Sequence, residues 1–241
     1  MRGHRFPAHP HAGFSAVSYV FEDSASSLRV LDSTGNDIQL GAGSIVRTQA
    51  GSGILHQELP VSGEHELHGI QFFVNLRSTN KQLAPQTWWL DGKALPVWRN
   101  TKGDSVRVAV GQYQELASPL RPAEPFTMLD MDVHSELDVS VPPDQHGFVY
   151  VQSGEISLHN GADTVSLQSG QGVHLVGTGH IRMATDSRAR AVFLCGQTIH
   201  ETVVMLGPFV MNNQQQIETA IQRYHSGRMG QMPSLSQEHG I

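Results

Sequence analysis

The sequence predicts an all-β protein with two similar domains in tandem and one helix near its C-terminus. Short segments rich in Val, Ile, Phe and Leu alternate with Gly, Ser, Asn and Asp, as in strands joined by tight turns. A weak internal repeat relates the two halves. Only one stretch, close to the end of the chain, has apolar residues at helical spacing. Regular strand spacing of this kind is typical of an antiparallel sandwich or barrel.

Nine segments have the composition and length of strands: residues 14–22, 44–49, 67–76, 106–112, 147–152, 155–159, 164–167, 173–176 and 189–194. Residues 33–37 and 160–163 combine Gly, Asn and Asp in the way that hairpin turns require. The helix is expected at about residues 213–225. Asn212 or Asn213 can cap its start, Gly227 lies where a C-cap would be, and an apolar stripe joins Ile217, Ala220, Ile221 and Tyr224.

The internal repeat divides the chain into two domains. Tyr19-Val20 resembles Tyr150-Val151, and the glycine-bounded segment 38–53 resembles 165–179. Four prolines (Pro96, Pro119, Pro122 and Pro125) place the boundary within about residues 95–125. We therefore predict an N-terminal domain of residues 1–105 and a C-terminal domain of residues 106–241 that includes the helix.

Composition excludes several classes of function. The chain has 241 residues, of which 39% are hydrophobic and 16% charged, values that fit a soluble globular protein. The net charge is −6 and the Lys and Arg residues are scattered, so we expect no direct binding to nucleic acid or to an anionic membrane. No apolar run is long enough to span a membrane, and the start lacks an apolar signal core, which favours the cytoplasm. The single cysteine, Cys195, lies in an apolar run and is expected to be a buried thiol.

Two short motifs predict a metal site in the first domain. His9-Pro10-His11 and His56-Gln57-Glu58 each place two metal-binding residue types at positions i and i+2. Such side chains lie on one face of a strand, so two facing strands would bring three imidazoles and one carboxylate to one point. This set suits Fe, Mn, Ni, Cu or Zn. On an octahedral ion it leaves two positions open, which suits chemistry better than a closed structural zinc site does.

The repeat serves as a control for these motifs. Aligned on the tyrosines, His9 and His11 fall opposite Ser140 and Pro142; aligned on the glycines, His56 and Glu58 fall opposite Arg182 and Ala184. The second domain thus has the frame without the ligands, and Asp144, His146, His174 and His180 there show no ligand spacing. Confinement of the four residues to one copy favours a functional site over a structural role.

Other interpretations remain open for the histidines. Imidazoles on a strand are often polar residues that have found hydrogen-bond partners, so a single His-x-His pair is weak evidence for metal. A competing cluster, Glu64-His65-Glu66-Leu67-His68, also places Glu66 and His68 on one face. We expect this cluster to be a solvated turn, or His68 to orient a metal ligand rather than to be one.

Nearly the whole chain resembles the pirin family of the cupin superfamily. The matching segments are His9-Pro10-His11-Ala12-Gly13-Phe14, the hairpin at 32–36, the second ligand motif at 50–58, the strand at 67–76, and the C-terminal signature at 207–212 and 224–228. The resemblance implies a bicupin, two jelly-roll-like β-barrels with one metal in the N-terminal barrel. Its ligands would be His9, His11, His56 and Glu58, and the metal in this family is usually iron, here Fe(II).

The resemblance leaves two functions open. Several pirins are quercetin 2,3-dioxygenases, so we expect cleavage of a flavonol-like hydroxy-ketone with O₂. Glu58 would be both ligand and catalytic base, and Phe14, Phe72 and Phe73 would form the pocket wall or the core. Other members are regulators, so the alternative is a non-enzymatic, redox-sensitive iron protein that binds a protein partner.

The sequence also departs from its relatives. They carry residues ahead of the first motif, so we expect either a shortened start or an edge covered by the tail helix and a partner chain, and an exposed edge would favour pairing between two copies. The segment 22–29, in the hairpin beside the metal motif, also differs from the pattern of the relatives.

Overall fold

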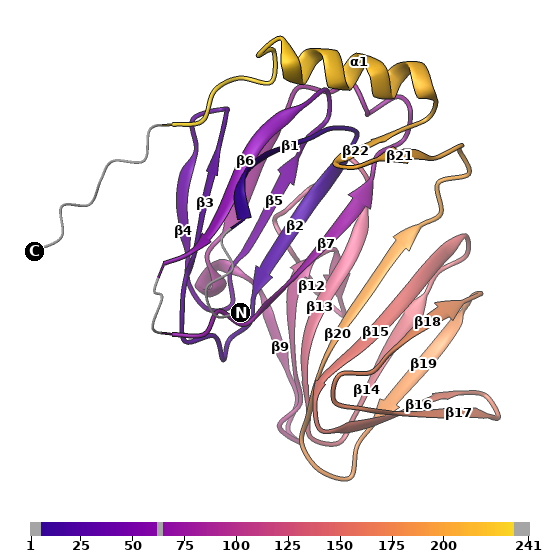
Figure 1. The fold of residues 1–241 in the computed structure, drawn as a ribbon. Helices are drawn as coiled ribbons and strands as arrows, with labels where there is room; N and C mark the ends of the chain where they lie inside the picture. The colour runs from indigo at the N-terminus through magenta and orange to yellow at the C-terminus, as the bar shows by residue number, and fades with distance from the viewer. Residues whose placement is uncertain (1–5, 62–64, 234–241) are drawn as a thin grey trace, which may run out of the picture. The chain divides into compact units, whose positions relative to one another are not determined.

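The computed structural model describes residues 6–61 and 65–233 and divides the chain into two compact units. Unit 1 comprises residues 1–93 and 199–241, and unit 2 comprises residues 94–198 (Figure 1). Among the described residues, no helix has the length and apolarity needed to cross a bilayer.

Unit 1 is built from two antiparallel four-stranded sheets. The first has the order β1 (Phe6–His11), β6 (Ile54–Pro60), β3 (Leu28–Asp32), β4 (Asp37–Leu40). The second has the order β7 (Gly69–Asn75), β2 (Phe14–Val20), β5 (Ile45–Gln49), β8 (Gln86–Leu90). In the β1–β6 ladder His9 lies directly opposite His56, because the edge strand β1 runs antiparallel to the strand that carries the second motif.

The C-terminal segment packs on unit 1. It contains the hairpin β21 (Val204–Leu206) and β22 (Phe209–Met211), followed by α1 (Gln214–His225), which lies across one end of the unit 1 strands (Figure 1). Asn213 caps α1 by accepting a hydrogen bond from the backbone N–H of Gln216. Ile217 and Ala220 of the predicted stripe are buried with Ala12 of the first motif and Ile221 is partly buried there, whereas Tyr224 is exposed. The predicted helix and its N-cap are therefore confirmed.

Unit 2 repeats the architecture of unit 1. One sheet has the order β14 (Glu136–Val141), β19 (Gly179–Ala184), β16 (Glu155–Asn160), β17 (Asp163–Gln168). The other has the order β18 (Gly172–Val176), β15 (Gln145–Ser153), β20 (Ala189–Gln197), β13 (Phe126–Val133), β10 (Ser105–Val110), β9 (Val97–Arg99). A small hairpin, β11 (Gln112–Tyr113) and β12 (Leu116–Ala117), follows β10, and a 3-10 turn at Gly92–Ala94 precedes β9.

Strand order confirms the internal repeat. The order β1-β6-β3-β4 in unit 1 corresponds to β14-β19-β16-β17 in unit 2, and β7-β2-β5 corresponds to β20-β15-β18. Tyr19 and Tyr150, on which the halves were aligned, lie on the equivalent strands β2 and β15.

The compact units do not coincide with the predicted domains. We predicted a division between residues 105 and 106, whereas the compact units divide at Lys93/Ala94. Residues 199–241, which we assigned to the second domain, group with unit 1. Burial of Phe209, Met211 and Ile217 with Ala12 accounts for this return of the chain to the first barrel.

The alignment of the second domain with the ligand motifs was off by one residue. Ser140 and Arg182, placed opposite His9 and His56, lie on the exposed faces of β14 and β19. The inward positions are apolar: Val139, Ile181 and Met183 are buried in the unit 2 core. Unit 2 thus has the same strands as unit 1, but hydrophobic side chains occupy the inward positions at which unit 1 has its histidines.

Candidate metal centre

Three histidines from two neighbouring strands meet inside unit 1. His9 and His11 project from β1, and His56 projects from β6. Their ring centroids are 4.5–4.6 Å apart in all three pairs. His11 and His56 are buried and His9 is partly exposed. Among the described residues these three form the group of His, Cys, Asp and Glu side chains able to share one ion.

The nitrogen atoms converge in a way that fits a metal ion. His9 Nε2 lies 3.0 Å from His11 Nε2 and 3.1 Å from His56 Nε2. Two nitrogens that bind one ion at about 2.1 Å lie about 3 Å apart when they meet at a right angle. His9 Nδ1 donates a hydrogen bond to the backbone carbonyl of Pro7 at 2.8 Å, which leaves its Nε2 lone pair free to bind.

Burial keeps two of the imidazoles neutral. Desolvation, helped by the positive charge that His9 can carry, lowers the pKa of His11 to about 4, against a smaller opposite effect from the Pro208 carbonyl. Burial, followed by the charges of His11 and His9, holds the pKa of His56 well below its usual value. Neutral imidazole is the form that binds metal, so the site is ready for an ion at neutral pH.

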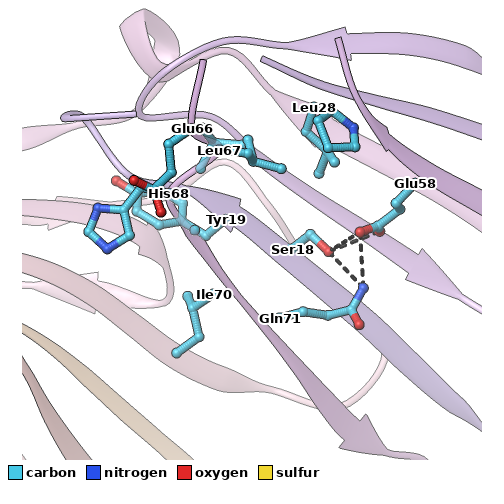
Figure 2. A pocket seen from close by; sticks show the side chains of 12 residues that line it. Ser18, Tyr19, Leu28, Glu58, Glu66, Leu67, His68, Ile70 and Gln71 are labelled. Carbon is cyan, nitrogen blue, oxygen red and sulfur yellow. Dashed lines mark hydrogen bonds between the residues drawn. The ribbon is translucent and has the colours of Figure 1, made fainter. Parts of the chain in front are cut away.

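Glu58 lies on the same inward face of β6 as His56 but is turned toward other partners. Its Oε1 is 3.9 Å from His56 Nδ1, beyond hydrogen-bonding range. Ser18 Oγ lies 2.9 Å from both carboxyl oxygens, and Gln71 Nε2 donates to Oε2 at 3.0 Å (Figure 2). Gln71 Nε2 also lies 3.1 Å from Ser18 Oγ. The three histidines are therefore brought together, while Glu58 stands beside them, held by a serine and a glutamine.

The environment of Glu58 gives its carboxyl the pKa of a proton acceptor at neutral pH. Burial raises the pKa of Glu58 to about 7, although the hydrogen bonds from Ser18 and Gln71 oppose the rise. A carboxyl with this pKa can take up or release a proton near pH 7.

A pocket of about 260 Å³ adjoins Glu58. Ser18 and Gln71 lie at its polar end beside Glu58, and Leu28, Leu67 and Ile70 supply apolar walls (Figure 2). Near the histidines, Phe73 is 55% exposed and its ring centroid lies 5.7 Å from that of His11. Phe14 is buried with its ring centroid 4.9 Å from that of His11, so two of the three suggested phenylalanines border the site.

The competing cluster does not join the histidines. His68 Nδ1 pairs with Asp23 Oδ1 at 2.8 Å, and His68 and Glu66 line the pocket beside Glu58. Glu64 lies outside the described residues. In unit 2, His146 Nδ1 lies 2.8 Å from His174 Nε2, and His180 Nδ1 lies 2.8 Å from Ser140 Oγ. These histidines therefore make hydrogen bonds in separate pairs.

Sequence reasoning missed Ser18 and Gln71. Ser18 was detectable in principle, since it is a polar residue within a strand that is buried along its whole length. Gln71 carried no such signal because β7 is an edge strand and Gln71 is among its exposed positions.

Comparisons with known proteins agree with this architecture. The pirin family model matches residues 1–74, and the model of the pirin C-terminal cupin domain matches residues 126–230. Pirin from Mus musculus is 33% identical over 239 residues, covering 93% of this chain and 78% of the mouse protein. A Pseudomonas aeruginosa protein, provisionally named a quercetin 2,3-dioxygenase, is 30% identical and covers 92% of this chain and 79% of its own length.

Solved structures share the fold. A quercetin 2,3-dioxygenase from Acinetobacter baumannii superposes with a TM-score of 0.82 at 24% identity. The match covers 94% of this chain and 79% of the A. baumannii chain. A bacterial pirin from Escherichia coli, solved in complex with nickel(II), superposes with a TM-score of 0.64 at 18% identity. The match covers 82% of this chain and 79% of the E. coli chain. These structures show that the fold is shared. The two family models and the relatives at 30% identity and above establish that the chain belongs to the pirin family.

Proposed function

We propose that this chain is a metal-dependent dioxygenase that cleaves quercetin-like flavonols with O₂. The observation that carries the proposal is the convergence of three imidazole Nε2 atoms beside a buried carboxyl whose pKa is about 7. Three nitrogens and one carboxylate suit Fe(II), and also Mn, Ni, Cu or Zn. The provisional name of the P. aeruginosa relative supports the substrate class.

Different residues of the site would bind the metal, transfer the proton and exclude water. His9, His11 and His56 would hold the ion, with Glu58 as the fourth ligand once its carboxylate turns from Ser18. A bound Fe(II) would supply a Lewis acid and an electron donor for O₂. Glu58 would take the proton from the substrate hydroxyl, and Gln71 and Ser18 would hold the carboxylate while it is turned away from the ion. The apolar walls at Leu28, Leu67 and Ile70 would exclude water from the aromatic substrate.

Oxygen uptake tests the proposal. Anaerobically iron-loaded protein is mixed with quercetin in an oxygen-electrode chamber, with His56→Ala as the matched variant. We expect uptake in the wild type that falls to background in the variant, because His56 is fully buried on β6, directly opposite His9 of β1. An absence of uptake by protein with one bound iron per chain would refute the enzymatic proposal.

A regulatory role is the second candidate. Glu58 is hydrogen-bonded to Ser18 and Gln71 and does not face the three imidazole nitrogens. A metal ion that also binds Glu58 would therefore break these hydrogen bonds and change the position of Gln71, which lies at an exposed strand edge. A partner protein that binds stoichiometrically to only the oxidised or only the reduced iron form would support this role. Equal binding to both forms, or none, would contradict it.

A further inference from the structure

Unit 2 contains a cavity larger than the pocket beside Glu58. Its volume is about 670 Å³, within the range of small-molecule binding sites. One wall is the inward face of β13 and β20, where Leu129 is paired with Phe193 and Thr127 with Cys195. Val139 of the edge strand β14 forms the opposite wall, and the β11–β12 hairpin borders the opening through Gln112 and Gln114.

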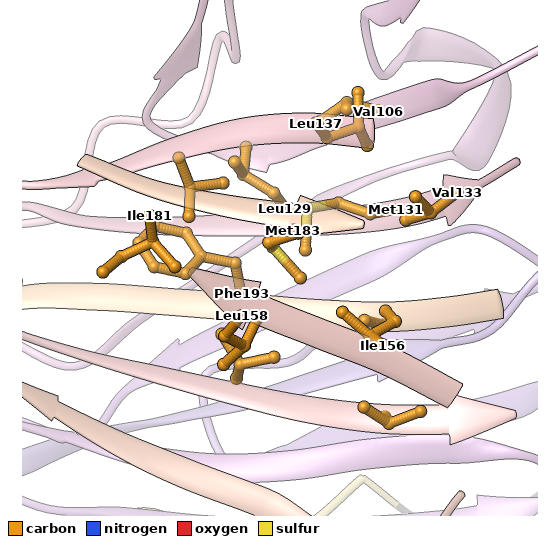
Figure 3. Close-up of a cluster of buried hydrophobic side chains, with 14 of the residues drawn as sticks. Val106, Leu129, Met131, Val133, Leu137, Ile156, Leu158, Ile181, Met183 and Phe193 are labelled. Atoms are coloured by element: carbon orange, nitrogen blue, oxygen red, sulfur yellow. The ribbon is translucent and has the colours of Figure 1, made fainter. Parts of the chain in front are cut away.

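The cavity contains the counterpart of one of the two residues that hold Glu58 in unit 1. In unit 1, Ser18 of β2 pairs with Gln71 of β7, and both hold Glu58. With Tyr19 aligned on Tyr150, the equivalent pair in unit 2 is Val149 of β15 and Phe193 of β20. Phe193 lies with Leu129 among the apolar side chains between the two sheets (Figure 3). The residues equivalent to Ser18 and Gln71 are thus apolar in unit 2, and one of them, Phe193, lines the cavity.

The rim of the cavity carries one sign of fixed charge. Asp138 is the carboxylate that lines it, and no Lys or Arg is among the lining residues. Arg182, the ladder neighbour of Asp138, does not line the cavity. The phenol of Tyr113 stays protonated because burial raises its pKa, and the charges of Asp138 and Asp104 add to the rise while a hydrogen bond from Gln114 opposes it.

Other polar groups complete the rim. Ser140 Oγ and His180 Nδ1 lie 2.8 Å apart beside Asp138. Gln114, in the turn of the hairpin, has a left-handed backbone (φ 49°) that few side chains adopt. A two-residue turn between β11 and β12 requires this conformation, which fixes the position of the hairpin at the rim.

We infer that the unit 2 cavity is a metal-independent binding site for a small aromatic cation that carries a hydroxyl group. The aromatic ring lies against the small apolar surface that Leu129, Val139 and Phe193 present to the cavity. The ammonium group pairs with Asp138, and the ligand hydroxyl bonds to the polar groups of Tyr113 or Thr127. An anionic aromatic of the same size is rejected because it would face Asp138 without a basic partner on the lining.

The single cysteine provides the reporter. Cys195 lies in the wall of this cavity and is 4% exposed, with its thiol donating to Gln145 Oε1 at 3.2 Å. The experiment measures the rate of Cys195 alkylation by N-ethylmaleimide in full-length metal-free His56→Ala protein, which silences the unit 1 site. The probes are serotonin, a hydroxylated aromatic cation, and 5-hydroxyindoleacetate, its anionic analogue. Saturation-transfer NMR with the same probes gives an independent readout of binding.

We expect serotonin to slow alkylation at least threefold and 5-hydroxyindoleacetate to leave it unchanged. Asp138→Asn should abolish the serotonin effect, whereas Asp186→Asn, a change at an exposed carboxylate of unit 2 outside the cavity lining, should not. Equal protection by both probes, or protection that survives Asp138→Asn, overturns the assignment of a cation. Absence of any probe signal by alkylation and by NMR overturns the site. Because the protein is metal-free, these outcomes are independent of oxygen uptake in unit 1.

Discussion

Glu58 is a carboxyl whose pKa is raised by burial and lowered by two neighbouring side chains. Burial raises its pKa to about 7, and the hydrogen bonds from Ser18 and Gln71 keep the pKa from rising further. Both donors stabilise the ionised form, so they favour the state in which Glu58 can bind metal or accept a proton. Ser18 and Gln71 are thus positioning residues for whatever chemistry the site performs.

Glu58→Gln tests the role of the base. In iron-loaded protein the substitution should lower quercetin-dependent oxygen uptake by about 100-fold or more, because the amide cannot accept a proton. Three histidines remain, so metal analysis should still find bound iron, though at reduced occupancy. Glu66→Gln, at a carboxylate that lines the same pocket, is the matched control and should retain most of the activity. Full activity in Glu58→Gln would show that Glu58 is not the catalytic base.

Ser18→Ala tests the hydrogen bond to Glu58. Removing a donor that lies 2.9 Å from both carboxyl oxygens destabilises the carboxylate, so the pKa of Glu58 in the metal-free protein should rise above 7. Infrared titration of the carbonyl band of the protonated carboxyl measures this pKa, and Glu58→Gln identifies the band by its loss. An unchanged midpoint would show that Ser18 is not coupled to the ionisation.

Asp104 in unit 2 gives a prediction for pH. Burial raises its pKa, but bonds from Ser135, the His134 backbone and Asn100 outweigh burial and leave the pKa below its usual value. A depressed folded pKa contributes stability above the unfolded pKa of about 4 that is lost as pH falls through the folded pKa. Asp104→Asn should therefore lower the free energy of unfolding by about 1–3 kcal/mol at pH 7. In urea titrations, the difference in free energy of unfolding between Asp104→Asn and the wild type should become smaller below pH 4. A difference that does not change with pH would show that the ionised carboxylate is not the cause of the stabilisation.

The histidines were predictable because their spacing encodes the geometry of the site. Positions i and i+2 on a strand fix a shared face, so His9 with His11 could be placed without knowing the fold. The partners of Glu58 come from β2 and β7, which β3, β4, β5 and β6 separate in the sequence. No local pattern reports such a long-range pairing, and only the ladder between Ser18 and Gln71 brings the two side chains together.

At the scale of elements, strands that are only partly apolar were hard to predict. All nine predicted strands correspond to observed ones, but several others were missed, including the central strand β13 and the amphipathic strands β14 and β19. Both amphipathic strands alternate a buried apolar residue with an exposed polar one, and the polar face includes Asp138, Ser140 and Arg182. Composition-based reasoning finds fully apolar strands such as β20 more readily than strands that are half solvated.

Lys81 attaches the C-terminal segment to the first barrel. Its side chain is fully buried, and Nζ donates to the carbonyls of Gly13 and Val210, both at 2.9 Å, and to Asn75 Oδ1 at 2.7 Å. Gly13 has a left-handed backbone (φ 84°), and a Cβ there would collide with the Val210 carbonyl. The connection between the His9-His11 strand and β2 is thereby fixed against β22.

Lys81→Met should lower the free energy of unfolding by about 3 kcal/mol, because three buried acceptors lose their donor. Hydrogen exchange should accelerate in β22 before other parts of unit 1 are affected. Lys102→Met is the matched control: Lys102 makes an exposed ion pair with Glu136, so its loss should change stability by less than about 1 kcal/mol. Equal destabilisation by the two substitutions would show that Lys81 is not a specific attachment point.

At the scale of the whole molecule, duplication has produced two barrels with different contents. Equivalent strands in equivalent order surround a cluster of imidazoles in unit 1 and apolar side chains in unit 2. The repeat was visible in the sequence because turn glycines and strand residues recur. The grouping of residues 199–241 with unit 1 was not visible, because no local pattern states which barrel a helix covers.

The division of contents predicts that metal stabilises only one of the units. An ion bound by His9, His11 and His56 adds about 2.7 kcal/mol of stability to the folded form when its free concentration is 100 times its Kd. All three ligands lie on β1 and β6, so hydrogen exchange with and without Fe(II) or Ni(II) should slow in these strands and leave β14 and β19, their equivalents in unit 2, unchanged. His56→Ala should remove the slowing. Protection that spreads equally over both sets of strands would mean that the two barrels unfold as one cooperative unit, and protection absent from β1 and β6 would mean that the histidines do not bind the ion.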